Sequence, residues 1–369
     1  MNAPLRVALL GAGTVGREVA RAFLERPEAL RTVDGSPLEL VSVAVRDIAR
    51  AAASGIPAEL LTDAPAHLVA APHTDVVVEV MGGDEPARTL IAAALDGGRS
   101  VVTANKHLLA HHGPQLESMA RAAGAALRFE GSVGGGIPVL TPLAAELASN
   151  EISRVRGIVN GTTNYILTAM ADEGGAYDDV LAAAQAAGYA EADPTADVEG
   201  LDAVNKLVIL ARLAFGVWLV PGDIPNRNGD DLPGITGVTK DDLEAANEEG
   251  LALKLVAEAR RPAGGARDAI EASVSCVALS QWSELAWIDG VTNHVEVDAE
   301  PLGRVGFTGP GAGGPATASA ILGDLLALAR GEGSTWAGLP EAGRGRVVAA
   351  ADGEAFVAPS GARYPLAAA

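Results

Sequence analysis

Hydrophobic residues in the first 130 positions fall alternately into short continuous runs and into segments with helical spacing. The continuous runs are rich in valine and leucine and only a few residues long, which favours buried strands. They lie at residues 6–10, 38–45, 76–80, 100–103 and about 125–129. The segments between them, such as 17–24 and 86–95, repeat apolar residues as an amphipathic helix does. Strands that alternate with helices predict an α/β fold with a parallel, doubly wound sheet of the Rossmann type.

A glycine-rich turn joins the first predicted strand to the first predicted helix. It reads Gly11-Ala12-Gly13-Thr14-Val15-Gly16. In a dinucleotide-binding fold the first glycine permits the tight turn, the second lets the backbone approach a pyrophosphate, and the third lets the helix pack closely on the strand. A turn without a ligand is the simpler alternative. The strand before the turn and the helix after it favour cofactor contacts at Gly11, Gly13, Thr14, Val15 and Gly16.

Further candidate cofactor residues stand at the ends of the later strands, where doubly wound sheets bind their ligands. Arg46 and Asp47 follow the second strand. An acidic residue there suits the 2′-hydroxyl of NAD, whereas an arginine suits the 2′-phosphate of NADP; a solvated ion pair is the alternative. The remaining candidates follow the third and fourth strands and are Met81, Gly82, Thr103 and Lys106. Taken alone, Lys106 could equally be a surface lysine.

Length, charge and cysteine content narrow the class of protein. A chain of 369 residues favours two domains. A net charge of −20 repels nucleic acid and anionic membranes, so we expect neither as a partner. No signal peptide is recognisable and no apolar run approaches the ~20 residues of a membrane span, so we expect a cytoplasmic protein. The single cysteine, Cys276, excludes a disulfide within the chain and lies in a strand-like run at 272–279.

The most informative segment runs from residue 184 to residue 206. Five carboxylates precede its final lysine, at Glu191, Asp193, Asp197, Glu199 and Asp202. Asp202 and Lys206 are four residues apart in a predicted helix, so they share one face. The apolar run 207–213 then takes this helix into the core. A partly buried lysine can act as a general acid or base, whereas a surface salt bridge is the alternative.

Two small-residue turns precede this segment. Residues 130–138 contain three consecutive glycines, so their backbone can approach a ligand, present carbonyls to a cation or serve as a hinge. Residues 160–164 read Asn-Gly-Thr-Thr-Asn and stand between a strand-like segment at 152–159 and an apolar helix. They supply either N-caps for that helix or a substrate-binding turn.

The segment 184–206 resembles the signature of the homoserine dehydrogenase family, AxxxGYxExDPxxDxxGxDxxxK, which it matches without a gap. The segments GAGTVG, VVTANK, EGSVGGGIP and NGTTNYIL and a late glycine loop at 309–319 stand in the family's order. The resemblance covers about residues 5–330. It implies an NAD(P)-dependent oxidoreductase of threonine and methionine biosynthesis that interconverts L-homoserine and L-aspartate 4-semialdehyde.

The resemblance also implies roles for individual residues. Lys206 corresponds to the proton donor and acceptor, and Asp202, together with Asp197, to residues that position it or the substrate. Glu191 corresponds to the group that binds the substrate ammonium, and Lys106 to a second lysine between cofactor and substrate. Lesser substrate contacts correspond to Gly161, Thr162 and Tyr189. Further cofactor contacts are implied at Gly309, Gly311 and Gly313. A sodium ion is implied at Glu130, Val133, Gly135 and Ile137.

Two domains and a homodimer follow from the same resemblance. Residues 1–138 are expected to bind NADP or NAD, with the chain returning to this domain at about 309–330, and residues 139–308 to bind substrate, catalyse the reaction and form the dimer. No role is predicted for 331–369, which are too few for the ACT-type regulatory domain of many family members. The rival enzyme is an aspartate-semialdehyde dehydrogenase, which needs a cysteine nucleophile. The rival from another class is a non-catalytic dinucleotide sensor, which needs no carboxylate–lysine cluster.

Overall fold

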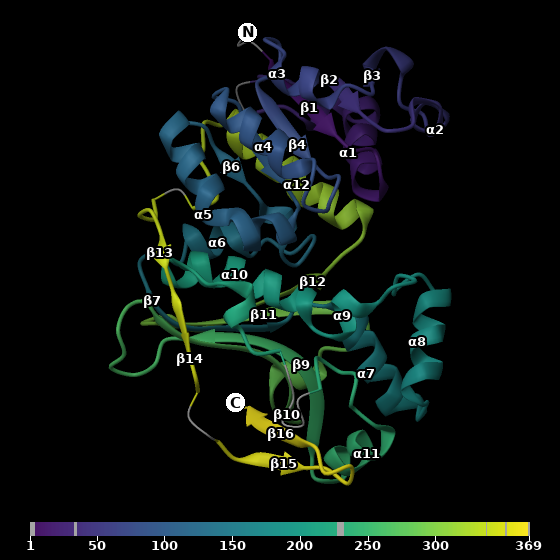
Figure 1. Ribbon diagram of the computed structural model, residues 1–369, viewed down its shortest axis with the longest axis vertical. Coiled ribbons are helices and arrows are strands. Elements are labelled where there is room, and N and C mark those ends of the chain that lie inside the picture. Colours follow the sequence, from purple (N-terminus) through teal and green to yellow (C-terminus); the bar gives the residue numbers. More distant parts are fainter. Residues whose placement is uncertain (1–3, 33–34, 227–231, 337, 351–352, 368–369) are drawn as a thin grey trace. The chain divides into compact units, whose positions relative to one another are not determined.

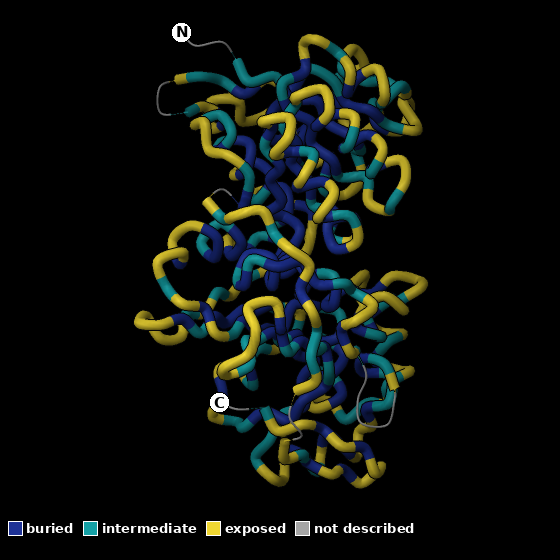
Figure 2. The backbone as a smooth tube through the Cα atoms, turned by 60° about the vertical axis from the view of Figure 1, so that its left-hand side comes forward, coloured by how far each residue is buried: buried dark blue, intermediate teal, exposed yellow. Residues whose placement is uncertain are grey.

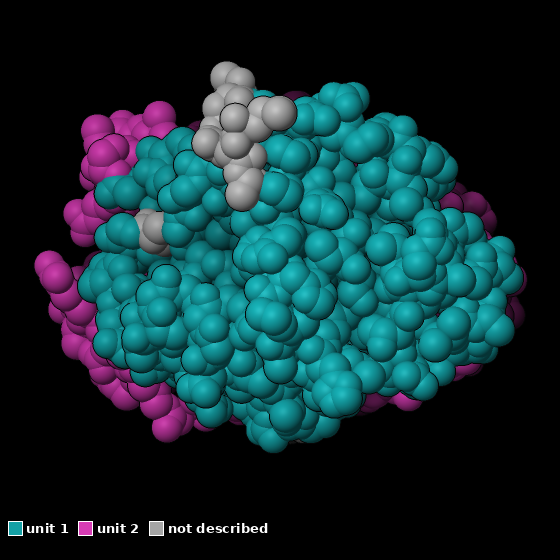
Figure 3. Space-filling model, turned by 90° about the horizontal axis from the view of Figure 1, so that it is seen from above, with its two compact units in different colours: residues 1–148, 312–342 teal, residues 149–311, 343–369 magenta. Residues whose placement is uncertain are grey.

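The computed structural model describes residues 4–32, 35–226, 232–336, 338–350 and 353–367. The chain divides into two compact units (Figure 3). Unit 1 comprises residues 1–148 and 312–342, and unit 2 comprises residues 149–311 and 343–369. Buried residues gather inside each unit, and exposed residues lie mainly along the loops (Figure 2). Among the described residues, no helix is both long enough and apolar enough to cross a membrane.

Unit 1 is built on a parallel sheet of six strands in the order β3-β2-β1-β4-β5-β6. The strands are β1 (Leu5–Leu10), β2 (Leu38–Ala44), β3 (Leu61–Thr62), β4 (Val76–Glu79), β5 (Ser100–Thr103) and β6 (Leu127–Arg128). From β1 the chain first builds the sheet toward β3 and then, after returning, toward β6 (Figure 1). This reversal is the hallmark of a doubly wound sheet. The predicted α/β fold of the Rossmann type is therefore confirmed.

Helices cover both faces of this sheet. The helices of unit 1 are α1 (Thr14–Glu25), α2 (Ile48–Ala53), α3 (Pro65–Ala70), α4 (Ala87–Asp96), α5 (Lys106–Ala123), α6 (Leu140–Ala144) and α12 (Gly314–Ala329). The four strand residues 7–10 are all fully buried. Because successive side chains of a strand point to opposite faces, this burial requires cover on both sides. Helices α1 and α12 pack against each other, as do α4 and α5.

Helix α12 brings a late segment of the chain back into unit 1. Its residues Ile321 and Leu325 join the core that Val7 and Leu9 of β1 form with α1. At the end of β6, the guanidinium Nε of Arg128 lies 2.7 Å from the carboxylate Oδ1 of Asp324 in α12. Both side chains are buried. A paired and hydrogen-bonded ion pair of this kind fixes the register of α12 against β6.

Unit 2 contains a mixed sheet in which β12-β11-β7-β9-β10-β16-β15 lie side by side and β14 also pairs with β10. These strands are β7 (Glu151–Ile158), β9 (Leu251–Arg260), β10 (Ala269–Ser280), β11 (Thr292–Glu300), β12 (Gly303–Pro310), β14 (Arg346–Val348), β15 (Ala355–Val357) and β16 (Arg363–Ala367). Neighbouring strands are antiparallel, except that β14 and β16 run parallel to β10. A separate two-stranded sheet joins β8 (Val217–Trp218) to β13 (Gly343–Arg344).

The helices of unit 2 are α7 (Gly161–Glu173), α8 (Tyr177–Ala186), α9 (Thr195–Val198), α10 (Leu201–Phe215) and α11 (Lys240–Glu248). Every residue from 206 to 213 in α10 is buried. The apolar run 207–213 therefore enters the core as predicted, and α10 packs on β7 and β9. Residues 221–233 are rich in proline, asparagine, glycine and aspartate, which predicts a surface loop; residues 227–231 lie outside the described residues.

The described part of the C-terminal segment is packed, although the sequence predicted no role for it. Strands β14 and β16 extend the sheet of unit 2 at β10. The buried carboxylate of Asp242 in α11 accepts hydrogen bonds from the Ser360 hydroxyl at 2.9 Å and from the Tyr364 hydroxyl at 3.0 Å. Nearer its start, Trp336 is buried in unit 1 with its ring centroid 5.4 Å from that of Phe129. The segment is thus a structural part of both units.

Candidate functional site

The glycine-rich turn of unit 1 has the geometry that its spacing predicts. Gly11 has a φ of 100°, which favours glycine. A Cβ at Gly16 would lie 2.0 Å from the Gly11 carbonyl oxygen, so only glycine lets α1 start this close to β1. A Cβ at Gly13 would meet nothing within 4 Å. The described residues thus give no packing reason for glycine at position 13, and a cofactor contact there stays a prediction.

The first turn of α1 is open to an anion. Gly13 is the N-cap and no side chain caps the helix. The first backbone N–H groups of a helix lack partners within it and carry the positive end of its dipole. Thr14 and Val15 contribute two of these N–H groups. This arrangement is the usual phosphate-binding feature of a dinucleotide fold.

A buried carboxylate at the end of β4 organises the neighbouring strand ends, and sequence reasoning missed it. Glu79 is fully buried, and its Oε1 accepts hydrogen bonds from the backbone N–H of Met81 at 2.8 Å and of Gly82 at 3.1 Å. Its Oε2 accepts a bond of 2.6 Å from the hydroxyl of Thr103 at the end of β5. Glu79 therefore holds together three residues that were predicted to contact the cofactor. The only signal in the sequence was an acidic residue in an otherwise apolar run.

Lys106 stands at the start of α5, beside the same group of residues. Asn105 caps this helix by accepting a bond from the Leu108 N–H, and its amide donates a bond of 2.7 Å to the Gly83 carbonyl. Thr103 in turn accepts a hydrogen bond from the Asn105 N–H at 3.0 Å. Lys106 is half-buried at the first position of the helix. Its backbone is thus fixed by the loops that Glu79 organises.

The two residues considered for contact with the adenosine ribose follow β2 and have different surroundings. Asp47 is the N-cap of α2, and its side chain accepts a hydrogen bond of 2.9 Å from the Arg50 N–H. Arg46 is exposed. Because its carboxylate caps a helix, Asp47 is less available to a ribose hydroxyl than Arg46 is to a phosphate.

The late glycine loop spans the change from unit 2 to unit 1. Gly309 lies in β12 opposite Asn293 of β11, and a Cβ at Gly311 would lie 2.0 Å from the Asn293 side chain. Packing within unit 2 therefore explains the glycine at 311. Gly313 is the N-cap of α12 in unit 1 and has a φ of 105°. A cofactor contact by these glycines stays a prediction.

The carboxylate of Glu130 is committed to the fold of unit 1. Its Oε1 accepts bonds of 2.8 Å from the N–H groups of Val139 and Leu140, and its Oε2 accepts bonds from the N–H and hydroxyl of Thr141 at 2.8 and 2.6 Å. These bonds cap α6. In the buried loop that follows Glu130, no described residue donates a hydrogen bond to the carbonyl oxygens of Val133, Gly135 or Ile137.

The predicted carboxylate–lysine pair forms in unit 2. Lys206 and Asp202 are both buried, and the Lys206 Nζ lies 2.7 Å from the Asp202 Oδ2. The same ammonium donates a hydrogen bond of 2.6 Å to the carbonyl oxygen of Val159 at the end of β7. The alternative of a surface salt bridge is therefore wrong for this pair, because both charges are withdrawn from water.

Asn160 joins this pair to a second carboxylate. Its side-chain amide donates bonds of 2.9 Å to Asp202 Oδ2 and 2.7 Å to Asp197 Oδ1. Its Oδ1 accepts a bond of 2.8 Å from the Thr163 N–H and so caps α7. The Thr162 hydroxyl lies 3.1 Å from Asp197 Oδ2 and 2.8 Å from the Tyr189 carbonyl. The N-cap interpretation of this turn is thus right, but the bridge between two carboxylates was missed.

The other predicted substrate residues lie around this cluster at the surface. Glu191 is exposed, and Tyr189 is exposed with its ring centroid 4.8 Å from that of Tyr165. Gly161 is the first residue of α7, where a Cβ would lie 2.9 Å from the Val291 carbonyl oxygen. The Thr162 hydroxyl therefore links Asp197 to the loop of Tyr189 through hydrogen bonds. In contrast, Glu191 has no described hydrogen bond to its carboxylate.

Cys276 is not a nucleophile in this fold. It is fully buried in β10, and burial raises the pKa of its thiol far above the usual value. A thiol with a raised pKa is not converted to the reactive thiolate at neutral pH. An acyl-enzyme mechanism, the requirement of the rival dehydrogenase, lacks its central group among the described residues.

Comparison with known proteins identifies the family. A family model described as homoserine dehydrogenase matches residues 138–326, and one described as the homoserine dehydrogenase NAD binding domain matches residues 11–130. A homoserine dehydrogenase of Mycobacterium tuberculosis is 46% identical over 330 residues, which are 89% of this chain and 73% of the relative. One of Corynebacterium glutamicum is 44% identical over 344 residues, 90% of this chain and 76% of the relative.

Solved structures agree. A homoserine dehydrogenase of Thiobacillus denitrificans superposes with a TM-score of 0.82 at 40% identity and covers 89% of this chain and 73% of that one. A hyperthermophilic archaeal homoserine dehydrogenase in complex with NADPH superposes with a TM-score of 0.71 at 27% identity, covering 89% of this chain and 98% of that one. The chain therefore belongs to the homoserine dehydrogenase family, oxidoreductases that interconvert L-homoserine and L-aspartate 4-semialdehyde with a nicotinamide cofactor.

Proposed function

We propose that Lys206 transfers the proton in this reaction and that Asp202 positions it. The single observation that carries the proposal is a buried ammonium held between the Asp202 carboxylate, at 2.7 Å, and the Val159 carbonyl, at 2.6 Å. Two fixed acceptors orient Nζ, and an adjacent carboxylate stabilises the ammonium form of a buried lysine. A positioned general acid or base of this kind contributes a rate factor of about 10²–10⁴.

The chemistry divides between cofactor and protein. Oxidation of homoserine removes a proton from its hydroxyl and a hydride from the carbon that bears it. When bound, the nicotinamide supplies the acceptor for the hydride. In this direction the neutral amine of Lys206 takes the hydroxyl proton and becomes an ammonium, and in the other direction the ammonium gives the proton to the aldehyde oxygen. Lys106, at the start of α5, is proposed as a second cation that orients the substrate oxygen.

The neighbouring carboxylates fit the other end of the substrate. Homoserine carries an α-ammonium, which needs anionic or carbonyl acceptors. Asp197 is anchored by Asn160 and Thr162, and Glu191 presents an exposed carboxylate beyond Tyr189. We assign the ammonium to Glu191 and Asp197, with Gly161, Thr162 and Tyr189 as lesser contacts.

The cofactor proposal is NADP with NAD tolerated. The residues of unit 1 fit a dinucleotide, because the uncapped first turn of α1 can receive the pyrophosphate beside Gly13. Arg46 is exposed at the end of β2 while Asp47 caps α2. A guanidinium binds a phosphate through two parallel hydrogen bonds. This supports recognition of a 2′-phosphate by Arg46.

We further propose a sodium ion in the loop 130–137. The buried carbonyl oxygens of Val133, Gly135 and Ile137 receive no hydrogen bond from a described donor, which fits a hard cation bound by backbone oxygens. The carboxylate of Glu130 is fully used by α6, so this residue would contribute its carbonyl oxygen rather than its side chain.

The homodimer is proposed to form through unit 2. Several large apolar side chains of this unit are exposed, among them Trp282 at 95%, Trp287 at 71% and Leu302 at 54%. Exposed apolar surface of this kind marks contact sites between proteins. Light scattering at micromolar concentration is expected to give the mass of two chains, and the mass of one chain would contradict the proposal.

The proposal for Lys206 is tested by Lys206→Ala and Lys206→Gln. We expect kcat to fall by about 10²–10⁴ in both variants, while the Kd for NADPH, measured by its fluorescence, stays within about twofold because unit 1 is unchanged. Lys240→Ala is the matched control, since Lys240 is an exposed lysine of the same unit. Near-normal turnover in a folded Lys206→Gln protein would remove Lys206 from the reaction.

A further inference from the structure

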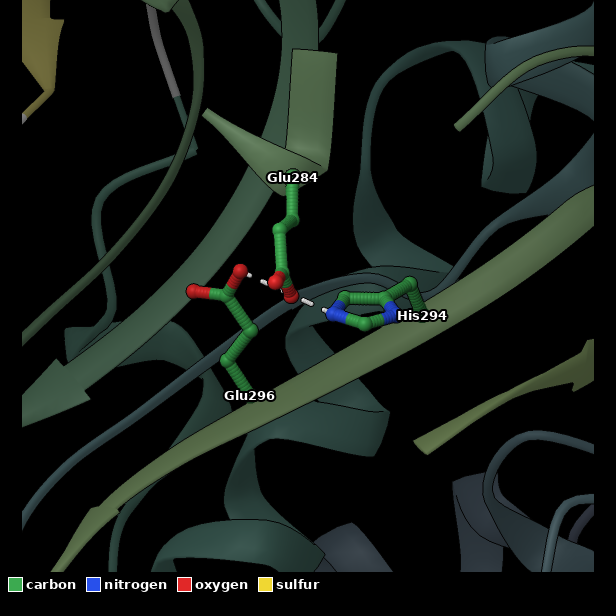
Figure 4. A group of neighbouring side chains, drawn as sticks. All are labelled: Glu284, His294 and Glu296. Carbon is green, nitrogen blue, oxygen red and sulfur yellow. Dashed lines mark ion pairs between the residues drawn. The ribbon is translucent and has the colours of Figure 1, made fainter. Parts of the chain in front are cut away.

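Three potential metal ligands gather in unit 2, apart from the Lys206 cluster. His294 and Glu296 are two residues apart on β11, so they lie on the same face of the strand. Glu284 begins the short helix η5 (Glu284–Trp287). One ligand atom of each residue lies within 4.8 Å of those of the other two. Figure 4 shows the three side chains pointing toward one another.

Two atoms of this group are buried without a hydrogen-bond partner. His294 and Glu296 are 4% and 2% exposed, and no described residue makes a hydrogen bond with the Nε2 of His294 or the Oε1 of Glu296. These two atoms are 3.6 Å apart, which is longer than a hydrogen bond. Buried polar atoms are normally satisfied, so each exception requires a reason. A cation between them would satisfy both.

The other ring nitrogen of His294 is already engaged. Its Nδ1 lies 2.5 Å from the hydroxyl oxygen of Thr308 on β12. When Nδ1–H donates to this oxygen, Nε2 carries the lone pair that a metal ion requires, and metal-binding histidines are commonly oriented in this way. Gly306 keeps the approach open, since a Cβ there would lie 3.2 Å from Nε2 and 2.8 Å from Cε1.

Two arginines lie beside one oxygen of the Glu296 carboxylate. The Arg156 Nε is 2.8 Å and the Arg304 Nε 3.8 Å from the Oε2 of Glu296, which leaves Oε1 directed at His294. The two guanidinium groups face Oε2 as counter-charges of the Glu296 carboxylate. Glu284 adds a second carboxylate and is itself exposed.

We propose that Glu284, His294 and Glu296 form a binding site for a divalent transition metal, with Zn²⁺ as the best-matched ion. One imidazole nitrogen and two carboxylate oxygens suit Zn²⁺ better than the oxygen-only preference of Mg²⁺ or Ca²⁺. Three protein ligands leave a further position for water. The ion would fasten η5 to β11. It takes no part in the proposed proton transfer, whose residues lie elsewhere in unit 2, so the two proposals stand or fall separately.

The test is metal binding to the full chain after removal of metals with a chelator. Equilibrium dialysis against ZnCl₂ is expected to give one tightly bound Zn²⁺ per chain, and Co²⁺ in its place is expected to give a visible d–d absorption band. Zn²⁺ should also raise the Tm, because a ligand that binds only the folded state stabilises it. Trp282 and Trp287 flank Glu284 in the sequence, so their fluorescence should change when Co²⁺ binds.

Two variants and two matched controls locate the ion. Glu284→Gln alters an exposed side chain, so the variant should fold normally and keep its turnover. Its affinity for Zn²⁺ should fall at least tenfold, and its Co²⁺ absorption band should disappear. His294→Asn should lose the same Zn²⁺ affinity and the same Co²⁺ band. Two control variants should bind Zn²⁺ as the unchanged protein does. They are Glu300→Gln, which alters an exposed glutamate of β11, and His73→Asn, which alters an exposed histidine of unit 1. Absence of saturable binding, which would mean that only a proton occupies the site, overturns the proposal. Unchanged affinity in Glu284→Gln overturns it too.

Discussion

Replacing Asn160 with aspartate changes one atom's chemistry at the centre of the carboxylate–lysine cluster. The asparagine amide donates to Asp197 at 2.7 Å and to Asp202 at 2.9 Å. An aspartate has the same shape but offers an oxygen in place of the amide nitrogen. Three carboxylates would then meet where the amide now separates two of them. The Asn160→Asp variant therefore measures how much this bridge contributes to the free energy of unfolding.

The magnitude follows from two competing costs. Two full charges about 2.8 Å apart repel by roughly 6 kcal/mol at an effective dielectric constant of about 20. Keeping one carboxyl protonated at pH 7 costs about 4 kcal/mol, since its ordinary pKa is near 4 and each unit is worth about 1.4 kcal/mol. Protonation costs less than the repulsion between two charged carboxylates, so the folded variant takes up a proton. We expect its free energy of unfolding at pH 7 to be about 4 kcal/mol lower.

The sign of the pH dependence follows from this proton. The folded variant holds one more proton than its unfolded chain between about pH 4 and pH 7, so its stability relative to the unchanged protein falls by about 1.4 kcal/mol per pH unit as the pH rises. Urea unfolding at about pH 5, 6 and 7 measures the slope. Turnover should also fall at least tenfold, because a proton shared with Asp202 weakens its contact with Lys206.

Asn160→Ser is the matched control. A serine hydroxyl can still accept the Thr163 N–H and cap α7, but it is too short to bridge Asp197 and Asp202. We expect a stability loss without the pH slope. An Asn160→Asp protein whose stability deficit is constant from about pH 5 to pH 7 would refute the reasoning, because no proton would then have been taken up.

Three other changes test separate parts of the fold. Glu79→Gln keeps the size of the side chain and leaves an amide oxygen to accept neutral bonds from Met81 and Gly82, but its amide nitrogen cannot accept the Thr103 hydroxyl. The Kd for NADPH should rise about tenfold, whereas the KM for homoserine stays within about twofold. Arg46→Ala should weaken NADP by roughly ten- to a hundredfold and leave NAD nearly unchanged, and equal losses for both would show that Arg46 does not bind the phosphate. Tyr364→Phe removes one hydrogen bond to the buried Asp242 carboxylate and should cost about 1.5–3 kcal/mol in unfolding at pH 7. Although burial would raise the pKa of Asp242, its hydrogen bonds with Ser360 and Thr239 lower it, so its contribution is present above about pH 4 and is lost as the pH falls further; the Tyr364→Phe deficit should shrink in the same range.

The elements of unit 1 could be predicted from sequence because their signals are local. The run 100–103 was predicted as a strand and is β5, and the run 76–80 differs from β4 by one residue. Buried parallel strands are continuous apolar runs, and glycine spacing marks the first turn. The pair Asp202–Lys206 could be predicted equally well, because two side chains four residues apart in a helix lie on one face.

Pairing between strands that are distant in the sequence could not be predicted in this way. The parallel contact of β14 with β10 joins Val347 to Ile270 across a large part of the chain, and no local pattern specifies it. The C-terminal segment therefore received no predicted role. The bridge of Asn160 to Asp197 and Asp202 fails for the same reason, because the capping preference of asparagine is local whereas its two acceptors come from α9 and α10.

Three buried carboxylates share a property that sequence reasoning cannot detect. Glu79, Glu130 and Asp242 each accept backbone N–H groups, at Met81 and Gly82, at Val139 to Thr141, and at Ser360 respectively. Each therefore fixes a loop rather than reacting with a substrate. A glutamate in a sequence carries the same letter whether it holds a loop or binds an ammonium. What separates the two kinds is the count of fixed donors around the carboxylate. By that measure Glu191, whose carboxylate accepts no described hydrogen bond, is available to a ligand, whereas Glu79 and Glu130 are not.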